Sequence, residues 1–155
     1  MDAFIGGGKM KRLILGICLM FAMVSMAYGA GTLTQDYAKH GALNIATLTW
    51  TTSAGGVFTA TATSKSINGM VVMVETNPDG TAVPTAAYDI TLLNSGGADV
   101  MGGSLADRSA TATELTMPLM NGNYTGVAVQ GPLTLTVTTA GNSKIGVVKV
   151  YYYAQ

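Results

Sequence analysis

The feature that most constrains the fold is a two-residue alternation of apolar side chains with threonine. In residues 58–63 Phe and Ala alternate with Thr, and in residues 133–138 Leu and Val alternate with Thr. Successive side chains of a β-strand point to opposite faces, so each stretch predicts a strand with a buried apolar face and an outer threonine face. The residues predicted to face inward are Phe58, Ala60, Ala62, Leu133, Leu135 and Val137.

Three further stretches predict strands. Ala46–Trp50 and Tyr88–Leu92 show the same alternation less cleanly, with Ala46, Leu48, Trp50, Tyr88, Ile90 and Leu92 as the inward sets. Residues 70–74 are apolar on both faces, which indicates a strand in the centre of a sheet. Beyond residue 29 there is no 3.6-residue apolar stripe with caps, so no helix is predicted there.

Short turn sequences separate these strands. Asn77–Gly80 combines a proline with a following glycine, and Ser95–Gly97 and Gly141–Ser143 are rich in residues that favour hairpin turns. About seven to nine short strands at such spacing are typical of an antiparallel two-sheet sandwich, Ig-like or jelly-roll-like. A small barrel is the alternative. The predicted fold class is therefore all-β.

The beginning of the chain has the layout of a secretory signal peptide. Basic residues between positions 9 and 12 precede an apolar run over residues 13–27, and small residues at Ala27 and Gly29 suit a signal peptidase. The run is short for a membrane span, which needs roughly 20 residues. We therefore predict a signal peptide over residues 1–29, cleavage near Gly29, and export to the periplasm or the exterior without a membrane anchor.

The first nine residues are unusual for a signal. Asp2 places a negative charge before the basic residues, and Gly6–Gly8 has no role in export. Consecutive glycine codons can spell a purine-rich ribosome-binding site, here just ahead of the codon for Met10. Our hypothesis is that translation starts at Met10 and that residues 1–9 are a mis-assigned start, with a start at Met1 as the alternative.

Residues after the signal predict one domain. The size of this domain allows a real core. The single cysteine of the whole chain, Cys18, lies in the predicted signal peptide, so no disulfide stabilises the domain. We predict an extended N-terminal lead-in over residues 30–41 and a single sandwich domain over residues 42–155.

Charge and side-chain inventory exclude several function classes. Charged residues are 10% of the chain and the formal net charge is zero, without the basic clusters that nucleic-acid binding requires. The one histidine, His40, lies in the polar lead-in, and no nucleophile or phosphate-loop motif occurs. Four scattered aspartates match no calcium loop and are interpreted as turn caps: Asp79, Asp89, Asp99 and Asp107. We predict no enzyme, cofactor or metal site.

The last strand carries the candidate interaction face. Over residues 147–153, alternation places Val148, Val150 and Tyr152 on one face. Lys149, Tyr151 and Tyr153 fall on the other, and a face bearing two tyrosines can bind a partner. The alternative is that cross-strand tyrosines simply cover the sheet.

Several stretches resemble small structural proteins of tailed bacteriophages. They are Tyr88–Leu92, Gly97–Gly103, Asp107–Thr111, Gly131–Val137, Ala140–Asn142 and Gly146–Tyr151. The resemblance implies a virion-associated β-sandwich that acts by packing against other protein subunits. The export signal departs from that family, whose members are usually assembled in the cytoplasm.

Two non-enzymatic functions follow. The first is a structural or assembly protein of a phage particle or an extracellular filament, whose partners are further copies of itself or other subunits. The alternative is a secreted carbohydrate- or surface-binding module, with Tyr124, Tyr151, Tyr153 and Trp50 as candidates for a stacking platform.

Overall fold

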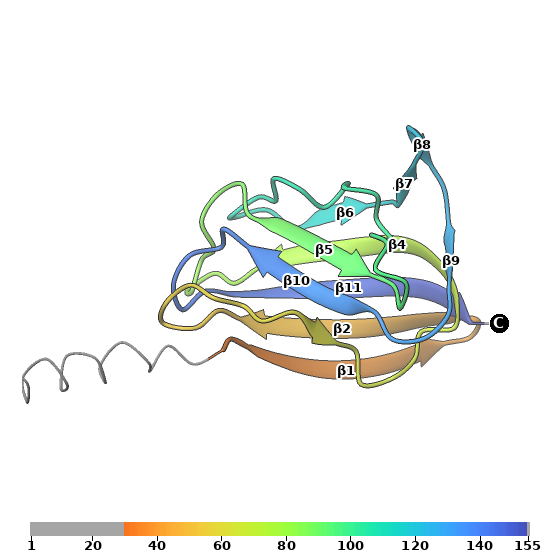
Figure 1. Ribbon diagram of the computed structural model, residues 1–155, viewed down its shortest axis with the longest axis horizontal. Helices are drawn as coiled ribbons and strands as arrows, with labels where there is room; N and C mark the ends of the chain where they lie inside the picture. The colour runs from red at the N-terminus through yellow and green to blue at the C-terminus, as the bar shows by residue number, and fades with distance from the viewer. Residues whose placement is uncertain (1–29, 155) are drawn as a thin grey trace, which may run out of the picture.

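The computed structural model describes residues 30–154, and the predicted signal peptide lies outside them. This part of the chain is all-β, with antiparallel strands and without a helix (Figure 1). In chain order the strands are β1 (Thr32–His40), β2 (Leu43–Thr51), β3 (Thr61–Ala62), β4 (Gly69–Pro78), β5 (Asp89–Leu93), β6 (Glu114–Thr116), β7 (Leu119–Met120), β8 (Asn123–Tyr124), β9 (Val127–Val129), β10 (Thr134–Thr138) and β11 (Ile145–Ala154).

The strands form the predicted two-layer sandwich. The larger sheet has the order β1-β2-β11-β4-β6, with β9 also paired to β4, and the smaller sheet has the order β3-β10-β5. Figure 1 shows β5 and β10 crossing in front of β4 and β11. The described residues hold more strands than predicted because residues 114–129 contribute four segments of only two or three residues.

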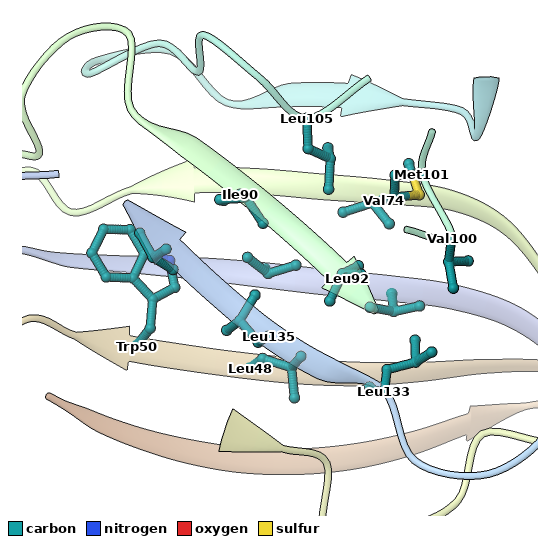
Figure 2. Packing of buried hydrophobic residues seen from close by; sticks show 14 of the residues in the cluster. Leu48, Trp50, Val74, Ile90, Leu92, Val100, Met101, Leu105, Leu133 and Leu135 are labelled. Atoms are coloured by element: carbon teal, nitrogen blue, oxygen red, sulfur yellow. The ribbon is translucent and has the colours of Figure 1, made fainter. Parts of the chain in front are cut away.

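The core lies between the two sheets. Figure 2 shows Leu48, Trp50 and Val74 of the larger sheet on the same cluster as Ile90, Leu92, Leu133 and Leu135. Val100, Met101 and Leu105, from the loop after β5, complete it. The inward sets predicted for Ala46–Trp50, Tyr88–Leu92 and Leu133–Val137 are confirmed, since all of these side chains are buried.

The prediction for residues 58–63 is only partly right. Phe58 is buried, but the strand is limited to Thr61–Ala62, and Thr63 rather than Ala62 faces the interior. The Thr63 hydroxyl accepts a hydrogen bond from the Leu133 N–H (3.0 Å) and donates one to the Lys65 carbonyl (2.8 Å). Burying a threonine whose hydroxyl is hydrogen-bonded in this way costs little free energy, so the inward side chain at this position is not apolar.

The predicted lead-in over residues 30–41 is extended, but it belongs to the larger sheet. As β1 it pairs with β2 from Thr32 opposite Thr51 to His40 opposite Leu43. Leu33 packs against the core. Gln35 reaches β3 and the residues just after it, where its Nε2 donates to the Ala62 carbonyl (3.2 Å) and its Oε1 accepts from the Ser64 N–H (2.6 Å). The sandwich therefore begins at Thr32, ahead of the predicted boundary at residue 42.

Of the three predicted hairpin turns, one joins paired segments. At Ser95–Gly97 the Gly97 N–H donates to the Asn94 carbonyl, and Leu93 pairs with Asp99 just beyond. The other two instead carry the chain between the sheets. Asn77–Gly80 begins with the last two residues of β4 and leads toward β5, and Gly141–Ser143 connects β10 to β11.

One edge of the larger sheet is interrupted. β6 pairs with Val74–Thr76 of β4, and β9 pairs with Gly69–Val71 on the same side of β4. Between β6 and β9 the chain leaves the sheet and forms the β7–β8 hairpin, which projects from the sandwich in Figure 1. This excursion positions one of the two candidate surfaces described next.

Candidate interaction surfaces

The side chains of the last strand, β11, alternate between a buried and an outward face as predicted. Val148 and Val150 of β11 are fully buried, and Lys149, Tyr151 and Tyr153 lie on the opposite, outward face. Since β11 lies between β2 and β4, this face is in the middle of the larger sheet.

A carboxylate that the sequence did not indicate organises this face. Glu75 of β4 is paired with Lys149, whose Nζ lies 2.7 Å from Glu75 Oε1, and the Tyr151 hydroxyl donates to Oε2 at 3.0 Å. The hydrogen bond from Lys149 holds the pKa of Glu75 below its ordinary value, and Glu75 raises the pKa of Lys149. Burial, followed by the hydrogen bond to Glu75, raises the pKa of Tyr151. Two of the three predicted residues thus direct their polar groups at Glu75.

Apolar side chains lie on one side of this ion pair, toward the C-terminal end of β11. Register places Tyr153 between Leu43 of β2 and Met70 of β4, and places Tyr151 between Ile45 and Met73. Tyr153 is 49% exposed and Met70 41%. We name this outward surface the sheet patch: Leu43, Ile45, Met70, Met73, Tyr151 and Tyr153.

A second surface lies where the β7–β8 hairpin leaves the sheet. A cavity of ≈ 440 Å³, here named the hairpin cavity, is lined by Ser104, Arg108, Glu114, Leu115, Thr116, Met117, Leu119 and Tyr124. The hairpin is held at its base by the Leu119 N–H, which donates to the Met101 carbonyl at 3.1 Å, and by the Thr125 N–H, which donates to the Pro118 carbonyl.

An ion pair forms the polar part of this cavity. Arg108 Nη1 lies 3.7 Å from Glu114 Oε2 and donates to the Thr116 hydroxyl at 3.0 Å, while Nε and Nη2 donate to the Ala106 carbonyl. Its side chain is only 12% exposed. The guanidinium is therefore fixed in one orientation by the protein itself.

The predicted stacking platform is only partly available. Trp50 is fully buried and packs against Tyr88, with ring centroids 5.6 Å apart, so its inclusion among the exposed aromatics was wrong. Alternation places Trp50 on the core face together with Leu48. Tyr124 of β8 is 67% exposed and lines the hairpin cavity, apart from the β11 tyrosines in the fold.

Three of the four aspartates interpreted as turn caps accept hydrogen bonds from the backbone. Asp79 accepts from the Thr81 and Ala82 N–H groups, which lowers its pKa, and Asp89 accepts from the Asp107 N–H. Asp99 accepts from the N–H group of Leu92 in β5 and from those of Met101 and Gly103 in the loop after it. His40 is exposed at the end of β1. Residues 30–154 contain no cluster of three or more His, Cys, Asp or Glu side chains arranged to hold a metal.

Comparison with protein-family models, with curated proteins and with solved structures found no match. The resemblance to phage structural proteins therefore stays a prediction. Within the described part of the chain there is no helix of the length and apolarity needed to span a membrane.

Proposed function

We propose that this protein is a non-enzymatic, exported structural protein that assembles with other protein subunits through the sheet patch. Those subunits are further copies of the chain or other components of a virion or an extracellular filament. The observation that supports this proposal best is the outward face of β4 and β11, where the exposed pair of Tyr153 and Met70 lies four residues along β11 from an ion pair that is already formed.

The chemistry of the sheet patch suits a protein surface. Burying apolar side chains against a partner stabilises the complex by roughly 25 cal/mol per Å² of surface removed from water. The Lys149 ammonium and the Glu75 carboxylate already satisfy each other, so a partner that covers them need not supply an opposite charge. Interface cores are depleted in unpaired charge and enriched in Tyr and Met, as this face is.

The oligomeric state tests this proposal. The chain from Ala30 to Gln155, as left by the predicted cleavage, is measured by multi-angle light scattering over a range of concentrations. A defined oligomer or filament that dissociates when Tyr153 is replaced by Ser supports the proposal. A monomer at all concentrations, unaffected by this change, contradicts self-assembly and leaves heterologous subunits as the partners to search for.

The alternative function, secreted carbohydrate or surface binding, is supported by a different observation. Tyr124 is the most exposed large apolar side chain of the described residues, and it borders the hairpin cavity rather than the sheet patch. The two functions therefore depend on separate tyrosines, which allows each to be removed without the other.

A further inference from the structure

The hairpin cavity forms where the chain between β6 and β9 leaves the edge of the larger sheet and does not pair with β4. A continuous edge strand would pair with all of β4 from Gly69 to Thr76, yet β6 and β9 cover only its two ends. Val72 and Met73 lie in the gap between them, next to the bulge opposite Tyr151 and Tyr152. The residues that leave the sheet supply Met117, Leu119 and Tyr124 to the cavity wall.

Three residues with exposed apolar side chains border this cavity. Among the described residues, six large apolar side chains are substantially exposed, and three of them line the cavity: Leu115 at 63%, Met117 at 45% and Tyr124 at 67%. Scattered exposed apolar residues need no explanation, but a group around a concave site is typical of ligand binding. The volume of ≈ 440 Å³ lies in the lower part of the range for small-molecule pockets, roughly 300–1,000 Å³.

The polar groups of the cavity indicate the chemistry of its ligand. Arg108 and Glu114 are the charged residues of the lining, and they neutralise each other, so a neutral ligand is favoured. Within residues 30–154, the Glu114 carboxylate accepts a hydrogen bond from the Ser109 N–H through Oε2. Its other oxygen, Oε1, can therefore accept a hydrogen bond from a ligand hydroxyl. Of the three hydroxyl groups in the lining, that of Ser104 already donates to the Met101 and Met117 carbonyls and that of Thr116 accepts from Arg108, so the Tyr124 hydroxyl is the further polar group offered to a ligand.

An exposed aromatic ring beside hydrogen-bonding groups matches a sugar ring, which has an apolar face of C–H groups and a rim of hydroxyls. We propose that the hairpin cavity binds a single neutral hexose ring, free or at the end of a glycan, stacked on Tyr124 and hydrogen-bonded to Glu114. This site does not depend on assembly through the sheet patch.

Titration with simple sugars tests the proposal. Two-dimensional ¹H–¹⁵N NMR spectra of the purified protein are recorded with increasing methyl glycosides of glucose, galactose, mannose and N-acetylglucosamine. We expect at least one glycoside to shift the amide signals of residues 114–119 and 124. Glucuronic acid, which adds a negative charge, binds more weakly than glucose if the lining is neutral as described.

Matched tyrosine variants assign the site. Tyr124→Ala is expected to weaken binding of that glycoside about tenfold, the loss that one aromatic stacking contact represents, while Tyr124→Phe retains most of it. Tyr153→Ala, which removes the exposed tyrosine of the sheet patch, leaves the affinity unchanged. Signals of the core amides report that each variant is folded. The proposal is overturned if no glycoside shifts the cavity amides, or if Tyr153→Ala removes binding and Tyr124→Ala does not.

Discussion

Lys149 and Glu75 lie directly opposite each other on β11 and β4, with the ammonium nitrogen 2.7 Å from a carboxylate oxygen. Their side chains are 35% and 15% exposed, so water screens this pair less than a fully exposed one. The pair satisfies two charges on the outward face of the larger sheet, where Lys149 lies beside Thr47 of β2 and Glu75 beside Leu115 of β6.

The Glu75 carboxylate makes stability depend on pH. Because its folded pKa lies below the ordinary 4.5, its contribution is present above pH 4.5 and is lost as the pH falls through the folded pKa. Glu75→Gln should lower the free energy of unfolding by about 0.5–1 kcal/mol at pH 7 and by clearly less near pH 3. Urea denaturation at both pH values measures the difference, with Asp36→Asn on the edge strand as control. An equal loss at both pH values would show that the carboxylate charge does not contribute.

Gly146 of β11 is required by the position of Trp50. A Cβ at residue 146 would overlap the indole ring and would lie 3.0 Å from its Nε1. Trp50 is fully buried and cannot move outward, so Gly146→Ala should destabilise the domain by about 1–3 kcal/mol through overpacking. Thermal unfolding measures the effect. Gly80→Ala is the matched control, because nothing lies within 4 Å of a Cβ there; similar losses in both variants would contradict the packing argument.

Opposite faces of β11 should respond differently to substitution. Val148→Lys places an unpaired charge in the core, and we expect a loss of about 4 kcal/mol, much of the ~5–15 kcal/mol stability of a domain. The double variant Tyr151→Ser and Tyr153→Ser should fold, losing about 1 kcal/mol with the hydrogen bond to Glu75, and should weaken assembly. Circular dichroism and light scattering separate the two results. An unfolded double variant would refute the assignment of the outward face to assembly.

Asp99 should stabilise the loop that closes the core. Its carboxylate accepts from the N–H groups of Leu92 (3.4 Å), Met101 (3.1 Å) and Gly103 (2.7 Å). Asp99→Ala leaves these donors to water or unpaired, so a loss of about 2 kcal/mol in unfolding free energy is expected. Hydrogen exchange should show faster exchange at Met101 in this variant. Asp36→Ala, at an exposed position on β1, serves as the control, and an equal loss there would argue against a specific role of Asp99.

The fold class and much of the core could be predicted from sequence because burial and strand periodicity coincide. Leu133, Leu135 and Val137 are buried as their alternation indicates. The prediction failed where polar side chains face inward. Gln35 of β1 and Thr63 find hydrogen-bond partners in distant parts of the sequence, at Ser64 and Leu133, so neither position carries the apolar signal that marks an inward side chain.

The candidate site was predictable in orientation but not in composition. Alternation alone places Tyr151 and Tyr153 on one face, whereas the partner Glu75 depends on the register between β4 and β11, which includes a bulge. The hairpin cavity depends on where β4 loses its neighbour, which is a property of pairing between strands distant in the sequence. No sequence pattern within residues 114–126 indicates the hairpin cavity.

The interrupted edge of β4 also gives the domain a tolerant insertion point. β6 and β9 are each anchored to β4, and none of residues 117–126 belongs to the hydrophobic core cluster, so neither sheet relies on the hairpin for its own pairing. Exposed excursions of this kind accept changes in length and sequence more readily than the elements that hold them. The sandwich can thus serve as a constant scaffold on which residues 117–126 diversify, so that new specificities arise without refolding the domain.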